Sequence, residues 1–209
     1  MTKNAPPSAR LRIVRRLLWS LVALALVGTA GFFVLSQAKT RDPQTGGSAV
    51  KAGFGGAFTL VGADSKPFSS QALSGKPYAI YFGFTRCGDI CPTTLSRLVK
   101  LRREAGNDLS MRIVFVTIDP SHDGPKEVGQ YASLFNAPII GLTGSETQIE
   151  NVKKKYGIFA EPVANAPMGK EMEHTATVLL FDRNGQFAAA ISPDEPDADA
   201  LAKIQSVLA

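Results

Sequence analysis

Cysteine and histidine are scarce in this sequence, which contains only two residues of each among 209. Any thiol chemistry therefore depends on one pair, Cys87 and Cys91, and any imidazole chemistry depends on His122 or His174. These four positions are the first candidates for a functional site.

The main part of the chain also lacks an excess of positive charge. There are 23 Lys and Arg against 18 Asp and Glu, but five of the positive residues lie within the first sixteen positions. The remaining chain carries 18 charges of each sign. Nucleic-acid-binding domains carry a basic face, so this balance gives no support to nucleic acid as a partner.

Charged residues are absent from residues 17–38, and Leu, Val, Ala and Phe dominate their first nineteen positions. Nineteen helical residues rise about 28 Å, close to the roughly 30 Å hydrocarbon thickness of a bilayer. We expect a basic cytoplasmic tail at 1–16, a transmembrane anchor at 17–38 and export of everything that follows. The alternative is a cleaved signal peptide ending near Ala38, although the apolar regions of signal peptides are shorter, at about 7–15 residues.

Residues 39–56 are rich in Gly and polar residues without periodicity, as is typical of a linker. The remaining segment, 57–209, is long enough for one domain and shows no internal repeat. We expect strands at 57–61, 66–68, 78–84, 112–118, 139–140, 176–181 and 186–191, and helices at 92–104, 125–135, 146–156 and 197–208. This order predicts an α/β fold of the thioredoxin-like type, a mixed sheet with helices on both faces.

Both cysteines fall where the strand at 78–84 passes into the helix that begins near Pro92. Open α/β sheets bind ligands beyond the carboxyl ends of their strands, and a helix N-terminus there stabilises a thiolate. Three intervening residues place the sulfurs one helical turn apart, where they can converge on a metal or close a disulfide. The less interesting alternative is a structural pair of buried thiols or a structural disulfide.

His174 precedes the strand at 176–181, and in a thioredoxin-like arrangement the loop entering this strand packs beside the cysteine turn. Two thiolates and an imidazole suit Cu(I), and with a further ligand they suit Cu(II) or Zn(II). The sequence thus indicates a metal site built from Cys87, Cys91 and His174.

Several other residues have weaker claims to a functional role. We interpret His122 as a solvated loop residue, although Asp119 in the same turn could orient a ligand or a loop. Met168 and Met172 could offer thioether ligands to copper, but loop packing explains them as well. The run Lys153–Lys155 is interpreted as a solvated helix face.

Four segments stand out together: Tyr81–Leu95, Val116–Pro120, Tyr156–Gly157 and Glu173–Thr175. In them the chain resembles the SCO/SenC family of membrane-anchored copper proteins, and the resemblance covers nearly all of the exported domain. It implies a thioredoxin-like domain that binds one copper ion, as Cu(I) or Cu(II), through Cys87, Cys91 and His174.

The family resemblance also implies a cellular role. Members deliver copper to the binuclear copper site of cytochrome c oxidase, or reduce the cysteines of that site so that it can load. The implied partners are the copper-site subunit of the oxidase and an upstream copper donor or thiol reductant. For a bacterial protein, the implied location is the inner membrane, with the domain in the periplasm.

Three positions depart from the family pattern. Gly88 stands where the family commonly has Pro, and Glu173 stands where it favours Asp. His122 replaces an Arg or another polar residue. None of the three removes a predicted ligand.

A thiol-disulfide oxidoreductase, with Cys87 as attacking thiolate and Cys91 as resolving partner, is the competing function. Such enzymes resemble one another in a proline before the strand that faces the cysteines, and residues 172–175 lack one. A peroxidase is a weaker alternative, because its reactive cysteine follows a Thr by three residues, whereas Thr85 precedes Cys87 by two. We therefore expect a metallochaperone rather than an enzyme.

Overall fold

The computed structural model describes residue 19 and residues 54–106, 110–163 and 172–209. The predicted tail at 1–16, the predicted anchor except for Trp19, and most of the predicted linker lie outside these residues. Within the described part, no helix has the length and apolar character needed to cross a membrane. Val50–Ala209 form one compact unit.

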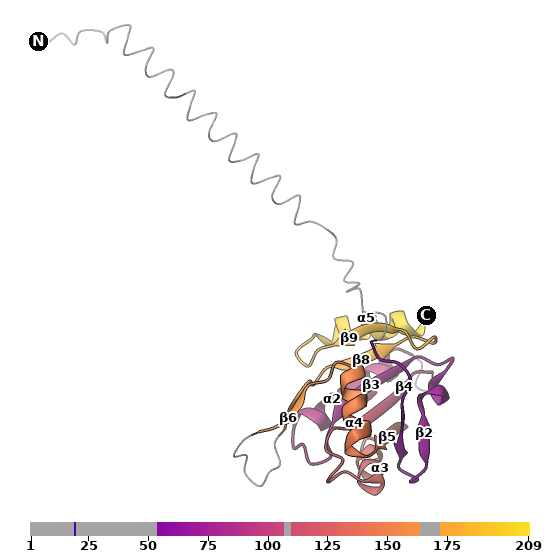
Figure 1. The fold of residues 1–209 in the computed structure, drawn as a ribbon. Helices are drawn as coiled ribbons and strands as arrows, with labels where there is room; N and C mark the ends of the chain where they lie inside the picture. The colour runs from indigo at the N-terminus through magenta and orange to yellow at the C-terminus, as the bar shows by residue number, and fades with distance from the viewer. Residues whose placement is uncertain (1–18, 20–53, 107–109, 164–171) are drawn as a thin grey trace, which may run out of the picture. The chain divides into compact units, whose positions relative to one another are not determined.

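Strands and helices alternate along the domain, as the hydrophobic pattern predicts (Figure 1). The strands are β1 (Thr59–Gly62), β2 (Pro67–Ser69), β3 (Tyr78–Gly83), β4 (Arg112–Thr117), β5 (Ile139–Thr143), β6 (Ala160–Pro162), β7 (Met172–His174), β8 (Val178–Phe181) and β9 (Phe187–Ile191). The helices are the 3-10 helix η1 (Ser70–Leu73), α2 (Ile90–Glu104), α3 (Pro125–Ser133), α4 (Glu146–Lys155) and α5 (Asp197–Leu208).

Seven strands form the main sheet, in the order β2-β1-β5-β4-β3-β8-β9. β3, β4 and β5 are parallel to one another, whereas β8 runs antiparallel to β3 and β1 antiparallel to β5. All six residues of the central strand β3 are buried, as expected for a strand covered on both faces. The mixed, thioredoxin-like sheet predicted from the sequence is confirmed.

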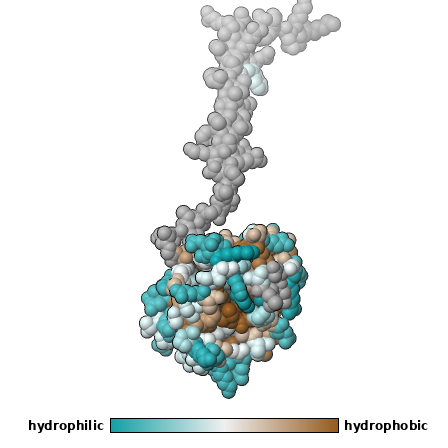
Figure 2. Space-filling model, turned by 90° about the vertical axis from the view of Figure 1, so that its right-hand side faces the viewer, coloured by the Kyte–Doolittle hydropathy of each residue, from teal (hydrophilic) through white to brown (hydrophobic). Residues whose placement is uncertain are grey.

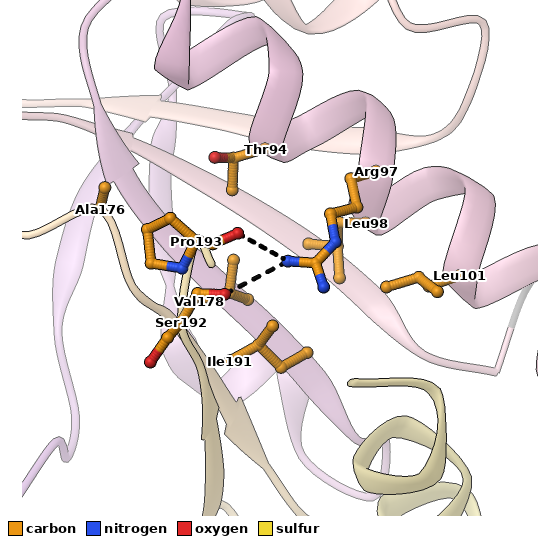
Figure 3. Close-up of a pocket in the computed structure, with 9 residues that line it drawn as sticks. All are labelled: Thr94, Arg97, Leu98, Leu101, Ala176, Val178, Ile191, Ser192 and Pro193. Carbon is orange, nitrogen blue, oxygen red and sulfur yellow. Dashed lines mark hydrogen bonds between the residues drawn. The ribbon is translucent and has the colours of Figure 1, made fainter. Parts of the chain in front are cut away.

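Helices cover both faces of this sheet. α2, α3 and α5 lie on one face, and α4 lies on the opposite face, in front of the sheet in Figure 1. Arg97 joins α2 to the start of α5, because its Nε donates to Asp197 at 2.7 Å. Its Nη1 also donates to the carbonyls of Ser192 and Pro193, at 3.2 and 3.3 Å, beside a small apolar pocket (Figure 3).

The two faces of β3 have different neighbours because successive side chains point in opposite directions. Phe82 points toward Tyr156 at the end of α4, with ring centroids 5.7 Å apart. Tyr81 and Gly83 point toward α2, where a carbon added at Gly83 would lie 2.9 Å from Cys91 Sγ. The carboxyl end of β3 therefore presents its α2 face to the cysteines.

The domain surface is mostly polar on the side that Figure 2 presents. Teal and white residues cover much of that face, and a smaller brown area lies between them. This is the ordinary appearance of a domain whose apolar side chains are largely enclosed in one core.

Three details differ from the sequence-based expectations. β6 and β7 form a separate two-stranded antiparallel sheet in a region expected to be a loop. Cys91 lies inside the first turn of α2 and is fully buried, rather than in a partly exposed turn. The interpretation of Lys153 as solvated is wrong: it is buried, and its ammonium donates to Glu150 at 2.5 Å and to the Ala160 carbonyl at 3.3 Å.

Candidate metal centre

The two cysteines occupy neighbouring but unlike environments at the end of β3. Cys87 is half-buried in the turn, which is closed by a hydrogen bond from its N–H to the Phe84 carbonyl at 3.2 Å. Cys91 is buried in α2, and its N–H donates to Cys87 Sγ at 3.4 Å. The helix N-terminus thus directs a backbone donor at the more accessible sulfur, as thiolate stabilisation requires.

Gly83 makes room for the buried sulfur. A side-chain carbon at this position would lie 2.9 Å from Cys91 Sγ and 3.1 Å from the Tyr81 ring. Real side-chain carbons do not approach other heavy atoms so closely. The absence of a side chain at Gly83 is therefore a condition for seating Cys91 against the sheet.

The β6–β7 sheet delivers the histidine to the cysteines. Ala160 pairs with His174, and the Thr175 N–H donates to the Phe159 carbonyl at 3.0 Å just beyond the paired strands. Lys153, on α4, donates to the carbonyl of Ala160 on β6 at 3.3 Å and so fixes this sheet to the domain. This short sheet sets the position of the imidazole.

The orientation of the imidazole follows from one hydrogen bond. His174 Nδ1 lies 3.1 Å from the carbonyl oxygen of Thr175. A carbonyl oxygen can only accept, so Nδ1 carries the proton and Nε2 keeps its lone pair. Nε2 lies 3.6 Å from Cys91 Sγ, and the rings of Phe84 and Tyr81 pack edge-on against the imidazole.

The structure brings the three predicted ligands together. One donor atom from each of Cys87, Cys91 and His174 lies within 4.8 Å of the other two. Two sulfurs and an imidazole nitrogen form a donor set that suits soft and borderline metals such as copper and zinc. The open neighbourhood of this set is a hollow lined by Phe84, Cys87, Gly88, Asp89, Ile90, Val163, Met172 and His174.

The two thiols differ in acidity. A hydrogen bond from the Cys91 side chain lowers the pKa of Cys87 to about 4, helped by His174 and by backbone N–H groups and opposed by burial. The hydrogen bond to Cys87 and burial raise the pKa of Cys91 above its usual value. The metal-free pair therefore holds one proton on Cys91 and the negative charge on Cys87.

A buried carboxylate holds the turn that leads to Cys87. Asp123 is fully buried and accepts three hydrogen bonds: from Thr85 N at 2.8 Å, from Thr85 Oγ1 at 2.5 Å and from Thr117 Oγ1 at 2.7 Å. Thr117 is the last residue of β4, so Asp123 ties the turn after β3 to the end of the next strand. The sequence does not reveal this role, because nothing in the local pattern shows that Asp123 is buried.

A second carboxylate holds the residue next to Cys87. Asp119 pairs with Arg86 at 2.6 Å and contacts His122 Nδ1 at 2.9 Å. Burial raises the pKa of Asp119, but hydrogen bonds from His122, Ser121 and Arg86 outweigh it, so the pKa lies below its usual value. Asp119 thus orients the loop, one of the two roles that the sequence suggested for it.

The remaining candidates lie around this centre or away from it. His122 is mostly exposed and lies outside the cluster of three donors. Met172 lines the hollow beside His174, whereas Glu173 is exposed on the opposite side of β7. Gly88 also lines the hollow, with open space where a side chain would project. Met168 lies outside the described residues.

Comparisons with known proteins find relatives over most of the chain. The family model described as SCO1/SenC matches residues 46–209. The SCO2 protein of Saccharomyces cerevisiae mitochondria is 30% identical over 212 residues, which cover 97% of this chain and 70% of that protein. A SCO2-like protein of Rickettsia prowazekii is 33% identical over 169 residues, which cover 78% of this chain and 82% of that protein.

A solved structure shows the same fold around a metal. The structure of Bradyrhizobium japonicum ScoI with copper bound superposes with a TM-score of 0.66 at 32% identity. The match covers 74% of this chain and 99% of that chain. The candidate site at the end of β3 thus lies in a fold that carries copper in that relative.

Proposed function

This chain belongs to the SCO1/SenC family, and we propose that it is a membrane-anchored copper metallochaperone for the binuclear copper site of cytochrome c oxidase. The observation that carries the proposal is the convergence of Cys87, Cys91 and His174 within 4.8 Å. The copper-bound ScoI structure supports copper as the metal. Thiolate sulfur and imidazole are also the donors that copper prefers.

The proposed ligands are the two thiolate sulfurs and His174 Nε2. Nε2 is the ring nitrogen that remains free once Nδ1 donates to the Thr175 carbonyl. Cys87 already favours its thiolate form, so copper binding displaces chiefly the proton of Cys91. These three ligands would bind one copper ion per domain, as Cu(I) or Cu(II).

The unequal burial of the sulfurs suits transfer to a partner. Cys87 is half-buried and lines an open hollow, while Cys91 is enclosed by the core. Incoming thiolates can approach copper from the Cys87 side while Cys91 still holds it. We propose that the partner is the copper-site subunit of the oxidase, and that an upstream donor supplies the metal.

A thiol-disulfide reductase acting on the same copper site remains a second candidate. The observation in its favour is the low pKa of Cys87 beside a protonated Cys91, which is the arrangement of an attacking thiolate and its resolving partner. This chemistry has no need of His174, whose placement against Cys91 at 3.6 Å favours metal binding.

The cellular location is proposed from the sequence. The uncharged segment 17–38 would anchor the protein in a bacterial-type inner membrane, with the basic residues 1–16 in the cytoplasm. Residues 57–209 would then lie in the periplasm.

Copper titration of the reduced, oxygen-free protein tests the proposed ligands. The wild-type protein is expected to bind one copper ion per chain. His174→Ala should lose tight Cu(II) binding and keep part of its Cu(I) binding, because Cu(I) is satisfied by two thiolates. His122→Ala is the matched control, since His122 lies outside the cluster. Unchanged Cu(II) affinity in His174→Ala would exclude His174 as a ligand.

A transfer experiment separates the chaperone from the reductase. The copper-loaded protein is mixed with the metal-free copper-site domain of an oxidase, and metal and thiols are measured on both partners. Movement of copper without oxidation of Cys87 and Cys91 supports the chaperone. When the oxidase domain is supplied with its own two cysteines joined as a disulfide, oxidation of Cys87 and Cys91 together with reduction of that disulfide, and without metal movement, supports the reductase.

A further inference from the structure

The hydroxyl of Tyr81 is buried beside the metal centre without a hydrogen bond. Tyr81 is fully buried on β3, and its oxygen has no hydrogen-bond partner of acceptable geometry among the described residues. Burying a hydroxyl in this way costs free energy, and such groups are uncommon in folded proteins. An unpaired hydroxyl at this depth is therefore expected to gain a partner in another state of the site.

Tyr81 faces two of the three proposed ligands. Its ring and Cys91 Sγ both approach the space left by the missing side chain of Gly83, at 3.1 and 2.9 Å from the position of an added carbon. The ring also packs edge-on against the imidazole of His174, with centroids 6.4 Å apart. Tyr81 thus lies between the main sheet and the proposed ligands Cys91 and His174.

Two side chains near the Tyr81 hydroxyl affect its pKa. Burial raises this pKa most, Cys91 raises it further and Thr94 lowers it. Thr94 is itself buried on α2, one turn after the cysteine. Cys91 Sγ and the Thr94 hydroxyl are therefore the two candidate partners for the Tyr81 hydroxyl.

The acceptor strength of this sulfur depends on the metal. A thiol sulfur is a weak acceptor. When the metal replaces the proton, the sulfur becomes an anionic ligand and a stronger acceptor. Cys91 is fully enclosed, so its hydrogen-bond donors must come from the protein.

Building on the proposed copper site, we infer that the Tyr81 hydroxyl donates a hydrogen bond to Cys91 Sγ when copper is bound, as a positioning residue that tunes affinity and potential. A donor on a ligating sulfur withdraws electron density from it. It thereby favours Cu(I) over Cu(II) and raises the energy of sulfur-to-copper charge transfer. Hydrogen bonds of this kind are worth about tenfold or more in metal affinity.

Tyr131 provides a matched control. Its hydroxyl is also buried and has no hydrogen-bond partner in the described part of the chain, and its ring belongs to the same aromatic cluster through Phe115. Burial and the charges of Cys91, Cys87 and Asp123 raise its pKa, but no hydrogen bond to sulfur contributes. Removing the Tyr131 hydroxyl changes the same chemical group without changing the proposed contact.

The experiment compares Tyr81→Phe, Tyr131→Phe and the wild-type full chain. In Tyr81→Phe, Cu(I) affinity is expected to fall about tenfold. The copper potential should also fall, and the Cu(II) absorption band should move to longer wavelength. Tyr131→Phe should match the wild type within about twofold. Equal affinity, potential and absorption in Tyr81→Phe and the wild type would overturn the inference.

The outcomes keep this inference separate from the proposed function. If the wild type binds no copper, the proposed function fails and the inference fails with it. If the wild type binds copper and Tyr81→Phe matches it in affinity, potential and absorption, only the hydrogen bond is overturned.

A second readout uses no copper. The metal-free Cys87–Cys91 pair is equilibrated with reduced and oxidised dithiothreitol, and the fraction of disulfide is measured. Because a thiol sulfur is a weak acceptor, this fraction should be the same in Tyr81→Phe and in the wild type. A different fraction in Tyr81→Phe alone would overturn the dependence of the hydrogen bond on copper.

Discussion

Two chemically identical thiols in this protein have different properties because one lies in a turn and the other in a helix. Cys87 receives the N–H of Cys91 at 3.4 Å and remains half exposed. Cys91 packs into the core against Gly83 and holds the proton of the pair. In the proposed copper site, Cys91 would bind the metal from the core side, while the Cys87 side would stay accessible to a partner.

The pKa of Cys87 leads to a pH prediction. Because the pKa is lowered to about 4, Cys87 should react with iodoacetamide at a nearly constant rate down to about pH 5, and more slowly below it. Cys91→Ala removes the hydrogen bond that lowers the pKa of Cys87 most. As the pH is lowered, Cys87 in this variant should therefore begin to lose reactivity at a higher pH than in the wild type. Mass spectrometry of the alkylated protein measures both profiles. A wild-type midpoint near pH 8.5 would contradict the asymmetry.

The same shift has a consequence for stability. A thiol whose pKa is lower in the folded protein than in the unfolded chain stabilises the fold fully above its unfolded pKa. That contribution is lost as the pH falls through the folded pKa of about 4. The reduced, metal-free domain should therefore lose stability progressively as the pH falls from the unfolded pKa of about 8.5 to the folded pKa of about 4, and most of this loss should precede the loss of alkylation.

At the level of single residues, the sequence allowed the candidate ligands to be predicted, but not how deeply each side chain is buried. Cys87, Cys91 and His174 could be selected because cysteine and histidine are scarce and fall at a strand end. The burial of Cys91 could not be predicted, because it depends on a contact with Gly83, which belongs to a different element, the strand β3. Lys153 was misjudged for a similar reason, since its partners Glu150 and Ala160 enclose it only after β6 forms.

At the level of elements, the metal centre is held by connections between loops rather than by the strands themselves. Asp123, in the loop after β4, binds Thr85 in the loop after β3 through two hydrogen bonds, at 2.8 and 2.5 Å. The Thr143 hydroxyl at the end of β5 donates to the Asp123 carbonyl at 2.6 Å. The carboxyl ends of three parallel strands thus share one anchor for the Cys87 turn.

Asp123→Asn tests this anchor. The amide replaces one acceptor oxygen by an NH2 group, so at least one of the three donors loses its partner. We expect a loss of about 1–3 kcal/mol in the free energy of unfolding, measured in urea. We also expect copper affinity to fall about tenfold, because Thr85 no longer fixes the approach to Cys87.

Asp182→Ala is the control for that variant. Asp182 Oδ1 accepts two backbone N–H groups in the β8–β9 hairpin, from Asn184 and Gln186, each at 2.8 Å. The register of Tyr78 with Phe181 places this hairpin at the opposite end of β3 from the cysteines. Asp182→Ala removes both hydrogen bonds, so it should lower stability without changing copper affinity. A similar loss of copper affinity in both variants would show that general destabilisation, not the anchor, is responsible.

Local sequence patterns explain why most elements were predictable and one pair was not. α5 begins and ends at Asp197 and Leu208 as expected, because its apolar residues repeat with helical spacing. β6 and β7 have three residues each and include Glu and Pro, which are rare in strands. Their pairing is a long-range contact that local propensity does not encode, although it is what positions His174.

At the level of the whole molecule, the charge distribution along the chain predicts an exported domain on a membrane anchor. Five positive residues precede an uncharged segment at 17–38, and the rest of the chain is electrically balanced. Positive residues beside a membrane span stay in the cytoplasm, so the domain that follows should cross. Copper handling by this domain would then take place in the periplasm.

Membrane fractionation and protease treatment of a bacterium expressing the full chain test this topology. The protein should remain with membranes after alkaline carbonate extraction, and a protease added to spheroplasts should digest the domain. Replacing Arg10, Arg12, Arg15 and Arg16 by Glu should leave part of the domain protected, because the charge that retains the N-terminus in the cytoplasm is lost. A shorter, carbonate-soluble product would instead identify residues 17–38 as a cleaved signal peptide. A domain protected from protease in the wild type would contradict export in either form.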